Sequence, residues 1–453
     1  MSVSEDRPAE SVVRWVEAEF GARVRKVARQ PRWRPVWFVD AECDGELKTF
    51  VVRGERLDAR IGFTLEHEMT LQRLLAERNL PVAAVHGWIE NPRAYVMDHV
   101  PGAEDFAAVS PEERDAVMDE YMASLARIHA LDVEPFAAAG LLRAARPSEA
   151  GSVGMRVYEE AYRAVKKRPD PFLEFALGWL RRNPAPPPVR ESVVLWDTGQ
   201  LLHADGKLGA MIDLEIGHIG DPMMDLAGFR MRGAEVGIGD FDRLYRVYAE
   251  RGGQPVDLEA IRHHYFSFAL CNQLAFHAAL AEPPPGSDYM MNLRWCIETN
   301  LYAIEALAEM LGVALEPVPV PAPRVSSARV AHGHGVAWLR NFEAADAVSQ
   351  NEVRSAFRLA RHLARADEIG AAVEEADLSD LGELLGTPPA DWQAGDRALE
   401  RFAIEHDGRH DRALVGIFHR RLHRALMTLG PEGSAIARHH PVAPLPRGES
   451  EPD

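Results

Sequence analysis

The sequence predicts an α+β fold in which a strand-rich N-terminal region precedes a longer, mostly helical one. Short alternating or apolar runs dominate the chain before about residue 100, and two of them flank Asp44-Gly45, a strong hairpin signal. Apolar residues recur at helical spacing from about residue 104 onwards. A proline-rich stretch at 316–323 has the composition of an interdomain linker, so we expect a separate all-helical domain after it.

The strand-rich region is expected to form a small α+β lobe. Its helix should begin at Leu65 and end near Arg78, because Leu80 precedes Pro81 and the residue before a proline disfavours the helical conformation. The expected strands are 23–28, 36–42, 47–53, 83–85 and 94–97.

The remaining chain is expected to be mostly helical. Between Glu112 and His129, for example, Val117, Tyr121 and Leu125 share one helical face. Three amphipathic helices are expected near the C-terminus, at 351–365, 392–406 and 411–429. The resulting division is an N-lobe at 1–101, a helical C-lobe at 102–313, a proline-rich linker at 314–329 and a C-terminal helical domain at 330–445.

Composition restricts the partners and the compartment. The chain has 453 residues and a formal net charge of −18, and an acidic surface repels nucleic-acid phosphates, so no nucleic-acid partner is expected. No apolar run approaches the roughly 20 residues of a membrane span, and the N-terminus lacks a signal-peptide pattern. The three cysteines (Cys43, Cys271 and Cys296) form no CxxC, which fits a reducing cytoplasm.

A second hairpin is expected around Asp205-Gly206, inside the helical region. If these are the two turn residues, Asp213 falls opposite Thr198, and Gln200 falls opposite Met211. Acidic and amide side chains would then gather at one end of the hairpin.

The residues at that end suggest a metal site. Asp197 and Asp213 would repel each other unless a cation lay between them, and Mg²⁺ prefers such oxygen ligands. Solvated strand ends are the alternative interpretation of both carboxylates. Asp221 precedes Pro222, a pattern typical of a helix start, so we expect it to cap a helix that braces the site.

The segments 210–215 and 218–227 resemble the metal-binding and following helix segments of the aminoglycoside phosphotransferase and choline kinase-like family. The resemblance covers roughly residues 12–312. It implies a two-lobed protein-kinase-like fold and an ATP- and Mg²⁺-dependent transfer of the γ-phosphate to a hydroxyl of a small molecule. Weaker matches are found at 80–82, 94–102 and 125–130.

The resemblance also implies roles for individual residues. Asp197 would orient the acceptor hydroxyl, whereas Asp213 would be the main Mg²⁺ ligand and Gln200 a second one. Arg53, at the end of the third strand, would hold nucleotide phosphates and pair with Glu68 of the following helix. A purely structural ion pair is the alternative for these last two residues.

The hinge between the lobes would bind adenine. By resemblance Met97, Asp98 and His99 would line it through backbone groups. For Met97, ordinary core packing is the stronger interpretation.

Two segments depart from the family pattern. The family usually has His-Gly-Asp followed five residues later by Asn, whereas this chain has Leu195-Trp196-Asp197 and then Gln200 in a loop about two residues shorter. The loop at 29–35, which would cover the phosphates, contains no glycine. These departures favour the alternative of a catalytically impaired, pseudokinase-like binding or scaffold protein.

The C-terminal helices carry no chemical motif. His419 and His423 lie at i and i+4, but no Glu follows His419, so the HExxH pattern fails and surface histidines are expected. The segment is expected to dock a protein partner or form a homodimer. The acceptor-binding regions mix acidic, basic and aromatic residues, so the sequence does not identify the small-molecule acceptor.

Overall fold

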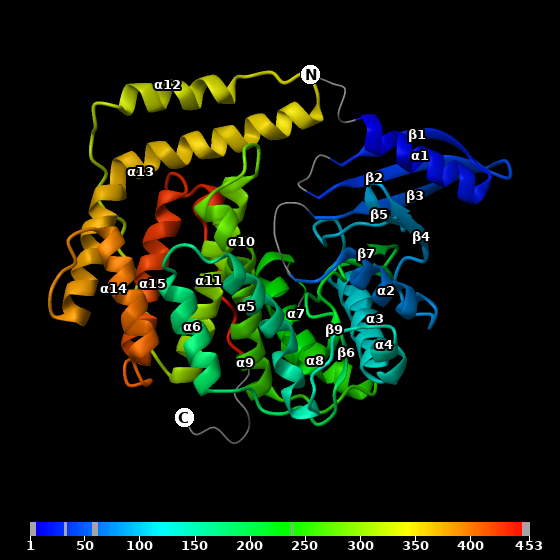
Figure 1. Ribbon diagram of the computed structural model, residues 1–453, viewed down its shortest axis with the longest axis horizontal. Helices are drawn as coiled ribbons and strands as arrows, with labels where there is room; N and C mark the ends of the chain where they lie inside the picture. Colours follow the sequence, from blue (N-terminus) through cyan, green and yellow to red (C-terminus); the bar gives the residue numbers. More distant parts are fainter. Residues whose placement is uncertain (1–5, 31–33, 57–61, 237, 239, 446–453) are drawn as a thin grey trace. The chain divides into compact units, whose positions relative to one another are not determined.

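The structure is a computed structural model that describes residues 6–30, 34–56, 62–236, 238 and 240–445 (Figure 1). The chain folds into two compact units. The first unit contains Met1–Val157 and Pro187–Ile261, and the second contains Tyr158–Pro186 and Arg262–Pro444. The four-part division expected from the sequence stays a prediction.

The first unit begins with a five-stranded antiparallel sheet of order β1-β2-β3-β5-β4. Asp44 and Gly45 both have positive φ, as the expected tight turn between β2 and β3 requires. The fourth strand begins where the predicted one ends, at Val85. The strands are β1 (Arg23–Arg29), β2 (Val36–Cys43), β3 (Glu46–Gly54), β4 (Val85–Glu90) and β5 (Arg93–Asp98).

Two helices accompany the sheet. Helix α1 (Asp6–Phe20), which sequence reasoning missed, buries Val12 and Val16 in a core shared with β2, β3 and β5. Helix α2 (Leu65–Ala76) begins after Thr64, whose hydroxyl accepts a hydrogen bond from the His67 backbone N–H at 3.2 Å. The predicted helix is therefore present, and its inward face carries a buried glutamate.

The rest of the first unit is mainly helical and includes two short ladders. Ser110 and Glu113 form a capping box that starts α3. Strand β6 (Ser192–Val194) pairs with β9 (His218–Gly220), and β7 (Leu201–Ala204) pairs with β8 (Lys207–Met211). The helices are α3 (Pro111–His129), α4 (Glu134–Ala138), α7 (Met223–Val236) and α8 (Phe241–Glu250), with a 3₁₀ turn at Pro147–Ser152. Helices α5 (Val153–Val165) and α9 (Leu258–Ala269) begin in the first unit and end in the second.

The second unit is helical. Leu301 of α11 packs against Leu426 and Leu429 at the end of α15, so two helices that are far apart in the sequence share a core. The three helices predicted near the C-terminus are present as α13, α14 and α15, although α13 is much longer than predicted. The helices are α6 (Pro171–Arg182), α10 (Cys271–Ala281), α11 (Tyr289–Leu311), α12 (Arg329–Arg340), α13 (Ala347–Leu385), α14 (Trp392–Glu405) and α15 (Asp411–Thr428), followed by a 3₁₀ turn at Ala435–Ala437.

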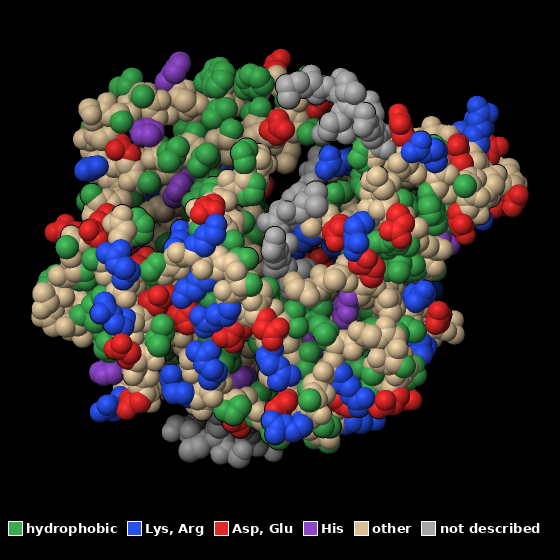
Figure 2. All heavy atoms as spheres, viewed as in Figure 1, with side chains coloured by type: hydrophobic (Ala, Val, Ile, Leu, Met, Phe, Trp, Pro, Cys, Tyr) green, Lys and Arg blue, Asp and Glu red, His purple; other side chains and the backbone are tan. Residues whose placement is uncertain are grey.

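The α+β class with a large C-terminal helical region is therefore confirmed. None of the described helices is both long and apolar enough to cross a membrane. Figure 2 shows acidic and basic side chains interspersed over the face that it draws.

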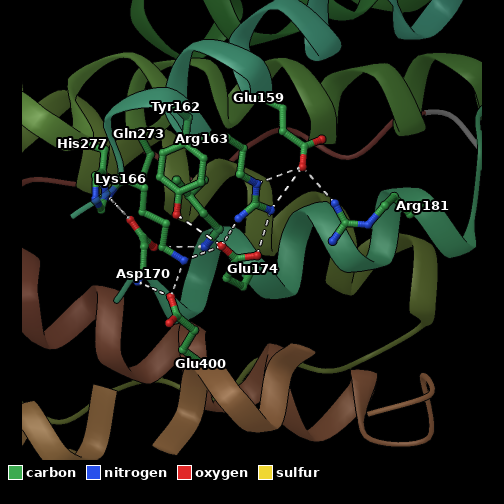
Figure 3. A network of polar contacts seen from close by, with 11 residues as sticks. Glu159, Tyr162, Arg163, Lys166, Asp170, Glu174, Arg181, Gln273, His277 and Glu400 are labelled. Atoms are coloured by element: carbon green, nitrogen blue, oxygen red, sulfur yellow. Dashed lines mark hydrogen bonds and ion pairs between the residues drawn. The ribbon is translucent and has the colours of Figure 1, made fainter. Parts of the chain in front are cut away.

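A buried charge network fixes several helices of the second unit (Figure 3). Glu174 of α6 is 3% exposed and accepts hydrogen bonds from Lys166 at 2.6 Å and from Arg163 at 2.8 Å. Lys166 also binds Glu400 of α14, at 2.7 Å. Although burial opposes ionisation, the two cations lower the pKa of Glu174, so the buried carboxylate stays charged and paired. The C-terminal helices are thus tied to α6 by charge as well as by packing.

Candidate active site

The β7–β8 hairpin turns where the sequence predicts, since Asp205 and Gly206 both have positive φ. The predicted register is wrong away from the turn. The pairs next to the turn, Ala204 with Lys207 and His203 with Leu208, follow the prediction. Further along, Leu201 pairs with Met211 and the Ile212 backbone N–H donates to the Gln200 carbonyl at 3.1 Å, so these partners are shifted by one residue. An irregularity between Leu202 and His203 causes the shift.

Gly209 allows this irregularity. A Cβ atom at this position would lie 3.1 Å from the Leu202 carbonyl oxygen, closer than a side chain normally approaches. Asp213, which follows the end of β8, still lies at the same end of the ladder as Gln200 and the Asp197 loop. The shift therefore alters the pairing and keeps the polar side chains at one end.

Asp225 of α7 holds the loop that carries Asp197. Its fully buried carboxylate accepts backbone hydrogen bonds from Leu195 at 3.0 Å and from Trp196 at 2.6 Å, and it pairs with the His129 ring at 2.9 Å. The sequence analysis gave this residue no role. Asp221, which it did single out, accepts the Met223 backbone N–H at 2.9 Å and starts α7 as expected.

Trp196 has a backbone conformation that normally requires glycine. Its φ is +64°, and its indole is fully buried. A Cβ atom at Gly154 would lie 2.2 Å from the indole ring, and one at Gly228 would lie 2.1 Å from the Trp196 carbonyl oxygen. Two glycines therefore make the space for this tryptophan beside Asp197.

Asp197 is 19% exposed and is held by two neighbours. Gln200 donates its amide N–H to Asp197 at 2.9 Å, and Arg232 of α7 forms an ion pair with the other carboxylate oxygen. Sequence reasoning missed Arg232, because no local pattern marks a basic residue 35 positions away from its partner. Among the residues predicted for catalysis and metal binding, Asp197 and Gln200 are thus in direct contact.

Asp213 pairs with Arg53. The same guanidinium lies 2.6 Å from the Glu68 carboxylate of α2, so the ion pair expected between Arg53 and Glu68 is present. Glu68 is almost fully buried, whereas the Asp213 side chain keeps 32% of its surface exposed. Arg53 therefore bridges a buried carboxylate to an accessible one.

Arg34 and Glu215 extend this chain of charges. The Arg34 guanidinium lies 2.6 Å from Glu68 and 2.6 Å from Glu215, and Arg56 binds Glu215 at 3.1 Å. Arg34 belongs to the glycine-free loop noted in the sequence, of which residues 31–33 lie outside the described residues. Its side chain links the N-terminal sheet to the segment after Asp213.

Burial and neighbouring charges shift the pKa values of Asp213 and Glu215 in opposite directions. Burial opposes ionisation of Asp213, but Arg53 and Arg34 outweigh it and lower the pKa of Asp213 to about 2. Burial and the charge of Asp213 together raise the pKa of Glu215 to about 7, against the opposing effect of Arg56. Asp213 is consequently ionised throughout the physiological range and available to a cation.

The predicted hinge residues lie at the end of β5. Met97 is partly buried, and its sulfur accepts a hydrogen bond from the Gln72 amide at 3.2 Å. His99 is exposed, and its backbone N–H donates to the Thr49 carbonyl at 3.3 Å. Their contact with adenine stays a prediction.

Within the described ranges, no cluster of three or more His, Cys, Asp or Glu side chains is placed to hold a metal ion. His419 and His423 lie close together, with ring centroids 4.5 Å apart, but His419 is buried, so the expectation of surface histidines is wrong for this residue. Both rings lie against His439 and Glu305 of their own unit, and burial lowers the pKa of each of the two. The pair is therefore part of a core.

Comparisons with known proteins complete the description. A model of the phosphotransferase enzyme family matches residues 33–264. A search of curated proteins finds no match.

Several solved structures are similar. Macrolide 2′-phosphotransferase MphH from Brachybacterium faecium shares 21% identity, with 61% of this chain and 98% of that chain covered and a TM-score of 0.43. Choline kinase LicA from Streptococcus pneumoniae shares 15% identity over 66% of this chain and 98% of that one, with a TM-score of 0.47. An aminoglycoside phosphotransferase in complex with ADP and hygromycin B shares 14% identity over 65% and 97%, with a TM-score of 0.45. Likeness at this level concerns the fold alone.

Proposed function

Because the chain belongs to the phosphotransferase enzyme family, whose model matches residues 33–264, we propose that it transfers the γ-phosphate of ATP to a hydroxyl of a small molecule with the help of Mg²⁺. The resemblance seen in segments 210–215 and 218–227 is confirmed by this match. The coarser statement, a small-molecule phosphotransferase, follows from the family. The nucleotide, the metal and the residue roles below are proposals.

One observation carries the proposal. The loop anchored by Asp225 and the end of the β7–β8 ladder bring Asp197, Gln200 and Asp213 to one place, and both aspartates keep part of their carboxylate surface exposed. Partly exposed carboxylates held in fixed positions are what hydroxyl activation and metal binding need.

We assign Asp197 to the acceptor hydroxyl. The hydroxyl oxygen attacks the γ-phosphorus, the bond to the bridging oxygen breaks, ADP leaves, and the hydroxyl proton passes to the Asp197 carboxylate. Gln200 and Arg232 orient that carboxylate from two sides. Arg232 also brings positive charge to the place where negative charge accumulates on the phosphoryl group.

Asp213 and Gln200 form a donor set suited to Mg²⁺. The amide nitrogen of Gln200 is used by Asp197, which leaves its amide oxygen for a metal, and Asp213 offers an ionised carboxylate. Mg²⁺ in such enzymes takes one or two protein oxygens and completes its shell with water and phosphate oxygens, so a cluster of three acidic ligands is not required. When bound, the metal neutralises charge on the phosphates.

Arg53 is assigned to the nucleotide phosphates, with Glu68 as the residue that orients it. In the structure Arg53 also pairs with Asp213, so ATP binding would exchange this carboxylate for a phosphate. The backbone of Met97 and His99 at the end of β5 is proposed to contact adenine. We place the activity in the cytoplasm, where ATP is available and where the three free, buried cysteines stay reduced.

A second function is favoured by one specific observation. Both aspartates are already paired with arginines, Asp197 with Arg232 and Asp213 with Arg53. If these pairs outcompete Mg²⁺, the chain is a pseudokinase-like binding or scaffold protein of the same fold. The replacement of the family's His-Gly by Leu195-Trp196 supports this alternative.

ADP release measured with Mg²⁺-ATP and a panel of small hydroxyl-bearing acceptors distinguishes the two functions. The phosphotransferase proposal predicts acceptor-dependent ADP formation that requires Mg²⁺ and is abolished by EDTA. Nucleotide binding, detected by thermal stabilisation, without ADP formation for any acceptor would support the scaffold function. Absence of any nucleotide binding would contradict the proposed use of ATP.

We further propose that the C-terminal helices contact a second copy or a protein partner. Large apolar side chains stay exposed on α12 and the start of α13, and Figure 2 shows apolar side chains gathered there. Trp338, for example, is 60% exposed. The molar mass measured by light scattering tests self-association. A dimeric wild type and a monomeric Trp338→Ser variant would support contact with a second copy. A monomer at all concentrations excludes it.

A further inference from the structure

A cavity of about 280 Å³ lies between α12 and α13 in the second unit, and its charge is unlike that of the whole chain. Five arginines line it, together with two carboxylates, although the chain carries a formal net charge of −18. Such a local surplus of positive charge attracts anions. The arginines are Arg324, Arg329, Arg340, Arg361 and Arg365.

The two carboxylates are already used. Arg365 pairs with Glu368 at 2.9 Å, and Arg324 lies 3.9 Å from Asp367. Within the described part of the chain, the other three arginines make no ion pair. The cavity therefore keeps about three positive charges without a protein counter-charge.

Arg365 is the most buried arginine of the cavity lining. Its residue surface is only 8% exposed, and its Nε–H has no hydrogen-bond partner, although one terminal nitrogen binds Glu368. Buried donors are rarely left unsatisfied, because an unmade hydrogen bond costs the desolvation of that group.

An aromatic ring holds two of the unpaired arginines. The guanidinium carbons of Arg340 and Arg361 lie 5.7 Å and 5.6 Å from the centre of the Phe357 ring. Contact with a ring face positions a guanidinium without using its N–H donors. The two side chains thus approach the cavity from α12 and α13 with donors to spare.

We propose that this cavity binds a small phosphate-bearing anion of about the size of pyrophosphate. Guanidinium groups match phosphate oxygens with paired hydrogen bonds, and several converging arginines favour a ligand with more than one negative charge. None of its lining residues belongs to the candidate active site. The site is therefore an addition to the proposed phosphotransferase and does not depend on it.

The test is isothermal titration of the full chain with inorganic pyrophosphate at constant ionic strength. We expect saturable binding that Arg340→Ala and Arg361→Ala each weaken by about tenfold, the usual effect of losing one charged hydrogen-bond pair. Arg361→Lys should weaken it less, because the charge stays while the paired donors are lost. Arg354, an exposed arginine of the same helix outside the cavity, gives the matched control, and Arg354→Ala should bind like the wild type.

Melting temperatures without ligand keep the result interpretable. Because Arg340 and Arg361 make no ion pair in the described structure, their removal should lower the melting temperature by no more than the small contribution of their contacts with Phe357, whereas the gain on adding pyrophosphate should shrink. Binding that Arg354→Ala weakens equally, or binding that depends on Arg53 and not on Arg340 or Arg361, would overturn the proposal. Equal affinity for citrate would overturn the assignment to phosphate.

Discussion

Replacing Asp197 by asparagine is expected to lower the turnover number of phosphoryl transfer by about 10²- to 10⁴-fold, the usual contribution of a positioned proton acceptor. The amide keeps the shape of the side chain but cannot take the hydroxyl proton. Nucleotide binding should change less than turnover, because Arg53, the residue proposed to hold the phosphates, pairs with Glu68 and Asp213. Steady-state ADP release and thermal stabilisation by Mg²⁺-ATP measure the two properties separately.

Asp205→Asn is the matched control for this variant. Asp205 is an exposed turn residue at the opposite end of the same ladder, and asparagine tolerates its positive φ. This control should retain wild-type turnover. Wild-type turnover in Asp197→Asn as well would exclude Asp197 as the proton acceptor, provided that both variants melt at the wild-type temperature.

Replacing Asp213 by asparagine is expected to weaken Mg²⁺-dependent ATP binding by about 10- to 100-fold, as for other hydrogen-bonded charged groups. Asparagine is the appropriate substitution, because Asp213 has a φ of +63° and alanine would add backbone strain. The variant should lose the part of the thermal stabilisation by ATP that requires Mg²⁺. Stabilisation by ATP with EDTA should be similar in both proteins or slightly larger in the variant, since Arg53 is then free of one carboxylate.

The same variant has a defined pH dependence. The pKa of Asp213 is lowered to about 2 from its ordinary value of 3.8, so its ion pair with Arg53 stabilises the fold above the unfolded-state pKa. That contribution is lost as the pH falls from about 4 towards 2. The difference in free energy of unfolding between wild type and Asp213→Asn should therefore be constant at neutral pH and shrink in this acid range. A constant difference down to pH 2 would contradict the assigned pairing.

Local signals in the sequence predicted much of the fold. Asp44-Gly45 and Asp205-Gly206 both form tight turns, because Asp and Gly accept positive φ with little strain. The pairing of Arg53 with Glu68, which the family resemblance implied, is also present. Helix α1 was missed, although Val12 and Val16 have the i,i+4 spacing of its buried face.

Other features depended on contacts that no local pattern contains. Arg34 binds Glu215, which lies 181 positions later in the chain. The Asp225 carboxylate accepts a hydrogen bond from the backbone N–H of Leu195, 30 positions earlier. The shift in the β7–β8 register depends on how closely Gly209 approaches the neighbouring strand. Charge partners for Asp197 and Asp213 were expected, but only the tertiary structure shows that they are arginines.

The buried indole of Trp196, beside Asp197, limits how this sequence can change. Exchanging Trp196 for the family's glycine would relieve its backbone and at the same time leave a hollow against Gly154, at a cost of about 3 kcal/mol or more. A side chain added at position 154 while Trp196 is still present would collide with the indole ring. Either single exchange is therefore expected to give a less stable protein, and only a joint exchange of the two positions can avoid both the hollow and the collision.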